Sequence, residues 1–314
     1  MANAYVGSLK EIALMRETTR GTKQALAGTP WLAHEGYDFG PKIEKSEATS
    51  GIGRIEARNQ GDITKEWSEG SLPLLLSKLN AERVMQMVFG SAGVAQVWSG
   101  IENSNAHTSF TVYVKDPVAG SKSYKLSMAN SITLGIQPDE YIQAGIDLVG
   151  SKEASESALT PAYPTNDEIL KPKQVSIKIA DNYAGLDAAV AVGTVQAFNL
   201  NVEKNVEPKW VVGSTEPEDI MNQRMGITGD LTLKYDVDTY RTLGLSDTTR
   251  AMRLEVISGT WGLVLDFPSV DFEDWSVESD LDGYMANTLG FKTNFKDLTN
   301  GQLKGKIDDT YVSA

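Results

Sequence analysis

Residues 61–67 read GDITKEW, and a matching pattern, GDLTLKY, returns 168 residues later at positions 229–235. Upstream, Phe39 followed by Ile43-Glu44-Lys45 returns in the same order as Phe198 followed by Val202-Glu203-Lys204. Alternation of apolar and polar residues is typical of β-strands. The sequence therefore predicts a duplicated unit of two strands joined by a long polar segment, 46–60 in the first copy and 205–228 in the second.

A helix is expected after the second strand of the first copy. Ser71 can cap a helix whose first turn tolerates Pro73. The apolar face of this helix would consist of Leu72, Leu75, Leu76 and Leu79. The pattern continues less regularly to Gly90, where we expect the helix to end.

The second copy predicts a shorter helix at the corresponding place. Asp236 or Asp238 can cap it, Tyr240 and Leu243 would lie on its apolar face, and Gly244 would form a left-handed C-cap. Each copy then has the order strand, loop, strand and helix. This shared order favours a true duplication over a chance match of short patterns.

Four further segments alternate apolar and polar residues with period two: 110–114, 175–179, 252–256 and 261–267. The first three predict antiparallel strands with one wet face. The fold class is therefore mainly β, with two tandem β-sandwich or partial-barrel domains that each carry a flanking α-helix. We place them at 1–155 and 174–314, joined by a linker at 156–173 that is rich in Ser, Pro and charged residues.

Composition excludes several classes of protein. The chain has 314 residues and no cysteine, which rules out disulfides and thiolate metal sites. Its net charge is -13, divided into -3 for residues 1–156 and -10 for residues 157–314. An acidic chain of this kind is not expected to grip nucleic acid. No segment approaches the ~20 apolar residues of a membrane span, and no signal peptide is expected.

Residues with catalytic potential are few. His34 and His107 are the only histidines, both in polar contexts where an exposed loop position is expected, and no nucleophile elbow accompanies either. Gly51-x-Gly53 does not continue into a phosphate-binding helix. The segment 280–283 lacks the spacing of a calcium loop. We therefore expect no catalytic residue, cofactor or metal.

Two sets of residues remain as candidates for surface function. Both polar loops are long enough to predict interaction. Their candidate contact residues are Glu47, Arg54, Arg58, Lys209, Glu216 and Arg224. A candidate acidic surface consists of Asp266, Asp271, Glu273, Asp274, Glu278, Asp280 and Asp282, with no Lys or Arg between them in sequence. This surface is either a solvated face or the wall of an electronegative channel.

Each copy combines a strand (ending at Ile43-Glu44-Lys45 in the first), a polar loop, a second strand (61–67) and a helix, and strands in 253–267 follow in the second copy. In this arrangement the chain resembles the tail tube (major tail) proteins of long-tailed bacteriophages. The closest likeness is to members with two fused tube domains. This resemblance implies a structural virion protein of the tail, assembled in the host cytoplasm. Its rings would stack into the conduit for DNA ejection, with DNA passing through without specific binding.

The resemblance also implies the partners. Two-domain members form trimeric rings with pseudo-sixfold symmetry, and hexameric rings of single-domain members are the alternative. The sheets of neighbouring subunits join into one inner barrel, and the long loop contacts the next ring. Further partners would be the tail tip or initiator, tape measure and terminator proteins.

Two other functions are open from the residues. A non-catalytic β-sandwich binding or adhesin module of a phage or cell surface would need exposed aromatic patches. A glycoside hydrolase would need paired carboxylates with aromatic sugar platforms, whereas the six tryptophans are scattered along the chain. An assembly protein is the preferred hypothesis.

Overall fold

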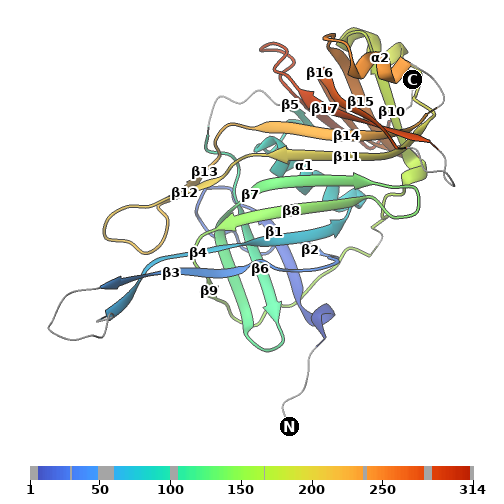
Figure 1. Cartoon of the computed structure of the whole chain (residues 1–314). Helices are drawn as coiled ribbons and strands as arrows, with labels where there is room; N and C mark the ends of the chain where they lie inside the picture. The colour runs from blue at the N-terminus through green and yellow to red at the C-terminus, as the bar shows by residue number, and fades with distance from the viewer. Residues whose placement is uncertain are drawn as a thin grey trace.

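A computed structural model describes residues 6–28, 30–48, 60–99, 105–165, 167–235, 239–278 and 285–311. These residues form one 16-stranded antiparallel sheet system and a separate two-stranded sheet, so the fold is mainly β as predicted. Within them, no helix has both the length and the apolar character needed to cross a membrane. Figure 1 shows the first half of the chain below the second, with consecutive strands continuing from one into the other.

The elements of the first half lie before residue 156. They are η1 (Gly7–Leu9), β1 (Glu11–Arg16), β2 (Trp31–Leu32), β3 (Gly40–Ala48), β4 (Gln60–Leu75), α1 (Lys78–Phe89), β5 (Val97–Ser99), β6 (Phe110–Asp116), β7 (Gly120–Ile136), β8 (Gln143–Gly150) and β9 (Ala154–Ser155).

The second half repeats this sequence of elements with small additions. They are η2 (Pro172–Gln174), β10 (Val175–Ala180), η3 (Tyr183–Ala188), β11 (Val195–Glu203), β12 (Glu207–Lys209), β13 (Asp219–Met221), β14 (Gly226–Lys234), α2 (Thr239–Gly244), β15 (Arg250–Ser258), β16 (Trp261–Glu278), β17 (Ala286–Thr293) and β18 (Lys304–Asp308).

Strand pairing follows the same order in both halves. It runs β1-β6-β7-β8-β4-β3 in the first and β10-β15-β16-β17-β14-β11 in the second. The longest strands, β7 and β16, pair along their first part with β6 and β15 and along their second part with β8 and β17. Each also has a bulge in its second part, near Asn130 and Asp274 respectively. Bulges bend strands. Each half is thus organised around one long strand that changes its partner.

Strand pairing and side-chain hydrogen bonds join the halves. Residues 198–203 of β11 pair with residues 131–136 of β7. The strand β18 pairs with β16 on one side and with β5 of the first half on the other. Glu168, in the segment between the halves, accepts hydrogen bonds from Lys78 of α1 (2.8 Å) and Ser258 of β15 (2.7 Å). The two repeats therefore share one continuous hydrogen-bonded framework.

The repeated topology does not superpose the two sequence patterns that first indicated it. Residues 61–67 pair only with β3, whereas residues 229–234 pair with both β11 and β17. The counterpart of Gly229 is Gly70, because a Cβ at either would lie 2.3 Å from a carbonyl oxygen of the preceding segment, Asn199 or Asp38. The GDITKEW and GDLTLKY patterns therefore occupy non-equivalent positions in the two repeats.

The predicted start of the first helix was wrong. Leu72 and Leu74 are buried on the core face of β4, which pairs with β8 down to Leu75. The helix begins after Ser77, which forms a capping box with Asn80. It ends as predicted at Gly90, which has a φ of 64°. Strand pairing with β8 overrides a leucine spacing that also fits a helix.

The second helix is present at the predicted place and spans Thr239–Gly244 in the described residues. Gly244 is its last residue rather than a left-handed cap, because its φ is not positive. The candidate caps Asp236 and Asp238 lie outside the described residues.

Strand periodicity predicted the strands correctly but not their wet faces. In β6, Thr111 and Tyr113 on the second face are 0% and 3% exposed, because the segment after β1 covers them. In β15, Glu255 is 2% exposed. His107 is likewise buried, against Gly90, and His34 is half-buried, so the exposed loop positions expected for both were wrong.

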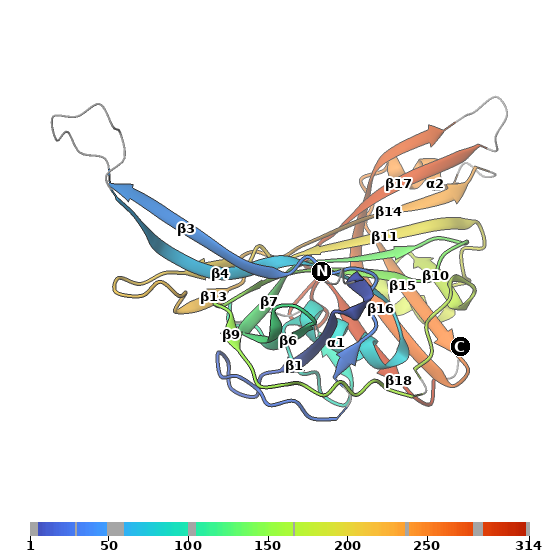
Figure 2. The ribbon, with the colours of Figure 1, turned by 90° about the horizontal axis from the view of Figure 1, so that it is seen from below.

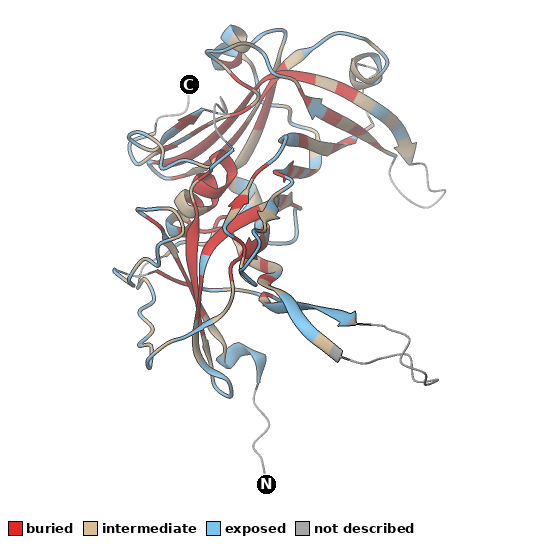
Figure 3. Ribbon diagram, turned by 90° about the vertical axis from the view of Figure 1, so that its left-hand side faces the viewer, coloured by how far each residue is buried: buried red, intermediate tan, exposed pale blue. Residues whose placement is uncertain are grey.

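Helix α1 lies between the halves and belongs to a core that both share. The main hydrophobic cluster contains Leu72 and Val88 together with Leu254 and Phe291. Phe89, at the end of α1, stacks on Trp98 of β5 at 6.2 Å. Burial is concentrated in these strands and helix, whereas the hairpin of β3 and β4 is largely exposed (Figure 3).

Candidate functional site

A polar, concave face extends over the joined strands of both halves. In Figure 1 the strands β14, β11, β7, β8 and β4 run side by side across the molecule. Their core-facing residues include Leu231, Phe198 and Ile132. The opposite face is hollowed into a groove of about 550 Å³ lined by residues from all five strands.

Paired residues form continuous rows across this face. One row, from β16 to β4, consists of Asp271, Lys292, Thr228, Asn201, Thr133, Gly145 and Pro73. The next consists of Glu273, Gly290, Asp230, Asn199, Gly135, Gln143 and Leu75. A third contains Glu203, Ser131 and Asp147. Most of these side chains are small or polar. They were not predicted from the sequence, although the alternation FNLNVE at 198–203 could have indicated them.

The three rows are predominantly acidic. They hold five carboxylates, those of Asp147, Glu203, Asp230, Asp271 and Glu273, and one lysine, Lys292. Lys292 lies 2.5 Å from Glu273, which raises the pKa of Lys292 through that hydrogen bond. Asp230 accepts a hydrogen bond from Asn199 at 2.9 Å. The face carries a net negative charge, and most of its uncharged residues are small (Gly, Ser, Thr and Asn).

Only part of the predicted acidic surface lies on this face. Asp271 and Glu273 do, and Asp274 is exposed at the bulge of β16. Asp266 is 7% exposed and lies 2.5 Å from Arg253, so its place in an acidic surface was wrong. Glu278 is the last residue of β16, and Asp280 and Asp282 lie outside the described residues.

Asp266 belongs instead to a buried ionic cluster on β10, β15 and β16. Arg253 also lies 2.7 Å from Asp187, and Lys178 lies 3.3 Å from Glu255. Burial, and then the carboxylates of Asp266 and Glu255, raise the pKa of Tyr183 and Tyr311 to about 12. Each charge has a partner, as buried charges require, and the cluster fastens η3 and residue 311 onto the sheet.

Among the strand edges left unpaired in the described residues, two lie at opposite ends of this series of strands. One is the outer edge of β3, whose only partner is β4. The other is β16 from Asp271 onward, where β17 is its only partner. The equivalent edge of β7 is covered by β11. Unpaired edges present free backbone donors and acceptors that accept another strand.

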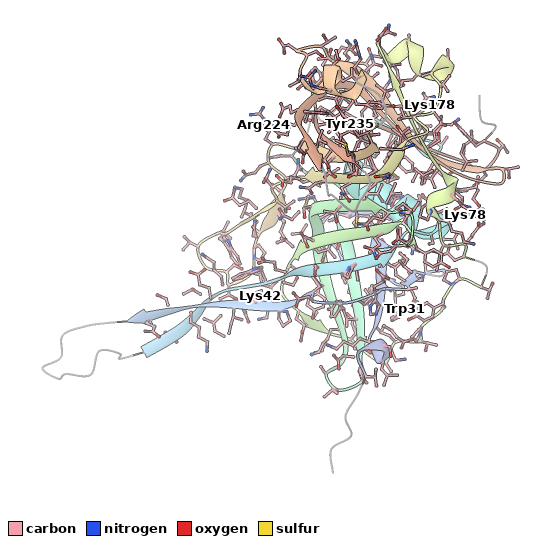
Figure 4. The ribbon with its side chains drawn as sticks, turned by 45° about the vertical axis from the view of Figure 1, so that its right-hand side comes forward. Trp31, Lys42, Lys78, Lys178, Arg224 and Tyr235 are labelled. Atoms are coloured by element: carbon pink, nitrogen blue, oxygen red, sulfur yellow. The ribbon has the colours of Figure 1, made fainter. Side chains whose placement is uncertain are left out.

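The first polar loop extends from a projecting arm, which we define as residues 40–48 of β3 and 60–67 of β4. Figure 2 shows the arm leaving the body, and Figure 4 places Lys42 on it, apart from Lys78 and Lys178 on the body. Ile43 and Ile63 are 52% and 43% exposed. The described residues of the arm form a two-stranded ribbon.

The second polar loop folds against the body. We call residues 205–225 the folded hairpin; it contains β12 and β13. Ile220 is fully buried against Met128 and Val149. Arg20 lies 2.9 Å from Asp219 and also donates to the carbonyl oxygens of His107 and Ile220. The two loops therefore have different environments despite their equivalent positions.

The candidate contact residues separate accordingly. Glu47 is exposed on the arm, whereas Arg54 and Arg58 lie outside the described residues. Lys209 pairs with Glu207 at 2.8 Å, Glu216 is half-buried, and Arg224 is exposed beside β14. Of the described candidates, Glu47 lies on the arm and the other three lie on the folded hairpin.

In the sequence, Lys204 is recognisable only as the counterpart of Lys45 in the repeated pattern. It is 2% exposed and donates a hydrogen bond to the carbonyl of Met87 at 2.6 Å, in the last turn of α1. Carbonyls there lack helical partners and attract positive charge. No local pattern could have revealed a contact between residues 117 positions apart.

No arrangement in the described parts of the chain points to catalysis. Within them, no group of three or more His, Asp and Glu side chains is placed to hold a metal ion. The largest features are the acidic concave face, two free strand edges and a projecting arm.

A family model described as phage tail tube protein matches residues 7–294, which is nearly the whole chain. β18 lies beyond the matched range. No curated protein matches the chain.

Proposed function

The chain belongs to the phage tail tube protein family, and from this premise we propose that three copies close into a ring of six tube units that stacks into the DNA conduit of the tail. The protein is thus a structural component of the virion tail. The units correspond to residues 1–155 and 174–314, with 156–173 between them.

One observation carries the ring. Within the chain, β11 of the second repeat pairs with the far part of β7 in the first. The unpaired edges of β3 and β16 are the equivalents of these two strands. A second chain can therefore place its β3 on β16 as β11 lies on β7, and head-to-tail contacts of one kind generate a closed ring. Six units then require three chains.

The concave acidic face would line the channel of this ring. Its rows run across the strands of both repeats and continue to the two free edges. Carboxylates there repel DNA phosphates, and small side chains leave the passage open. A lysine-rich wall would instead bind the duplex at many phosphates. The adhesin alternative gives no reason for this acidic face to continue to two free edges.

The arm would contact the next ring. It projects from the body and exposes Ile43 and Ile63, which a stacked ring would bury. Tail tip or initiator, tape measure and terminator proteins would be further partners. Assembly would take place in the host cytoplasm.

An engineered disulfide tests the ring directly, because the chain has no cysteine. Counting from the matched carbonyls of Asp38 and Asn199, Gly40 corresponds to Asn201, which pairs with Thr133 beyond the bulge of β7. Ser276 lies beyond the bulge of β16. Assembled Gly40→Cys/Ser276→Cys protein should oxidise to covalent trimers on non-reducing gels, and electron microscopy should show rings with a central channel.

The matched control joins Gly40→Cys with Val118→Cys, a position 74% exposed in the loop between β6 and β7. This pair should remain monomeric on the gel. Covalent hexamers or a persistent monomer in the test pair would contradict the three-chain ring.

A further inference from the structure

The folded hairpin of the second repeat contacts the base of the arm of the first. The backbone N–H of Glu66 donates to the carbonyl of Thr215 at 2.7 Å, and the Thr215 hydroxyl donates to the Glu66 carboxylate at 2.9 Å. Lys152 lies 2.6 Å from the same carboxylate. Residues 149 positions apart are thus joined through backbone and side chain.

Aromatic contacts reinforce this junction. Trp210, in the turn of the folded hairpin, meets Trp67 edge-to-face with ring centroids 6.0 Å apart. The amino group of Lys65 lies 5.6 Å from the Trp210 ring, and Lys65 also pairs with Glu44 across the arm at 2.7 Å. Edge-to-face aromatic pairs have a preferred geometry, so this contact sets an orientation as well as a distance.

The folded hairpin is itself fixed to the body on its other side. Arg20 binds Asp219, and Ile220 is fully buried against β7 and β8. The backbone N–H of Val206 donates to the Asn130 side chain at 2.8 Å, at the bulge of β7. A continuous series of contacts therefore runs from the body through the hairpin to Glu66 and Trp67.

In the described residues of the arm, 40–48 and 60–67, the two strands pair only with each other. The β4–β8 pairing begins at Ser68. An isolated two-stranded ribbon is marginally stable in water. Its direction depends on what holds its base.

We propose that the folded hairpin is a brace that fixes the direction of the arm, so that the second repeat positions the stacking element of the first. Trp210 and Thr215 are its positioning residues, and Lys152 of the first repeat binds the same Glu66 carboxylate. This explains why one loop of the duplicated pair projects while its counterpart folds back. The effect on stacking rests on the proposed function, whereas the effect on the arm itself does not.

Hydrogen exchange measured by mass spectrometry on the purified full chain tests the brace without assembly. Trp210→Ala should speed amide exchange in residues 61–67 at least tenfold and leave β7 and β8 unchanged, because local opening follows the loss of supporting contacts. Thr215→Ala, which removes one hydroxyl, should have a smaller effect in the same segment, and Thr215→Ser should restore the wild-type rate.

The matched control is Lys209→Ala, in the same hairpin, whose side chain pairs only with its neighbour Glu207. Exchange in residues 61–67 should remain within twofold of wild type. Equal exchange in Trp210→Ala and wild type would overturn the brace. So would an equal increase in Lys209→Ala, because any disturbance of the hairpin would then suffice.

Assembly provides a separate readout. Brace variants should still close rings, as judged by the Gly40→Cys/Ser276→Cys cross-link, but form shorter stacks. If wild-type protein forms no rings, the proposed function fails, while the exchange experiment still decides the brace. Normal tube lengths combined with faster arm exchange would show that the brace does not guide stacking.

Discussion

The arm and the folded hairpin occupy the same place in the two repeats, between a first and a second strand of the same pairing order. Counted between the matched positions, Gly40 to Gly70 and Asn201 to Gly229, the two segments have nearly the same length, yet only the second folds back, with Ile220 buried. The arm's isoleucines, Ile43 and Ile63, are instead 52% and 43% exposed. Anchoring residues, and not loop length, decide whether such a segment projects.

The largest effect should come from Lys204, and Lys45, its counterpart in the repeated sequence pattern, provides the comparison. Lys204→Ala removes a buried side chain and leaves the Met87 carbonyl unpaired, which we expect to lower the free energy of unfolding by about 4 kcal/mol. Lys45→Ala, on the exposed arm, should cost less than about 0.5 kcal/mol. Urea denaturation of both variants makes the comparison, and equal losses would show that the two loops are anchored alike.

Two glycine variants compare a tightly packed position of the second repeat, Gly229, with an open position of the first, Gly40. A Cβ at Gly229 would lie 2.3 Å from the Asn199 oxygen and 2.4 Å from the Phe291 ring. Gly229→Ala should therefore cost about 3 kcal/mol through overpacking. Gly40→Ala, which meets no atom within 4 Å, is the control and should cost less than about 0.5 kcal/mol. Thermal unfolding measures both, and a well-tolerated Gly229→Ala would disprove the close approach of Gly229 to Asn199 and Phe291.

The smallest effect should be the pH dependence of stability that comes from the Glu66 carboxylate. Hydrogen bonds from Lys152, and then from Thr215, lower the pKa of Glu66 below its usual 4.5. A carboxylate whose pKa is lower when folded stabilises the fold above pH 4.5, and this contribution disappears as pH falls through the folded pKa. Wild type should therefore have a slightly higher Tm than Glu66→Gln at pH 7. This difference should shrink progressively below pH 4.5. A difference that stays constant with pH would remove the Glu66 carboxylate from the junction of arm and hairpin.

The sequence could predict those parts of the fold that depend on local pattern. Period-two segments located β6, β10, β15 and β16, and Gly90 marked the end of α1 correctly. The leucines at 72–76 fitted a helix as well as a strand, and only pairing with the distant β8 decides between them. The duplication was predicted from an echo that proved out of register, because Gly61 and Gly229 have different neighbours.

The candidate site was less predictable because its features join distant residues. Asp266 and Asp271 lie in one acidic run, yet Arg253 on β15 buries the first and Lys292 on β17 adjoins the second. Arg20 reaches Asp219 across 199 residues, and nothing near either one indicates the contact. The polar rows were recognisable strand by strand, but their continuity required the register of seven strands.

The pairing of β5 with β18 has a consequence for the order of folding during synthesis. Residues 97–99 leave the ribosome long before residues 304–308, with which their backbone groups form hydrogen bonds. At about 5 to 20 residues per second, the interval of roughly 200 residues lasts about 10 to 40 s. Throughout that time Trp98 can stack on Phe89, but the edge of β5 lacks its partner strand. The joint between the repeats is thus completed late, and a nascent chain cannot acquire its final shape, or offer it to other copies, before β18 has been made.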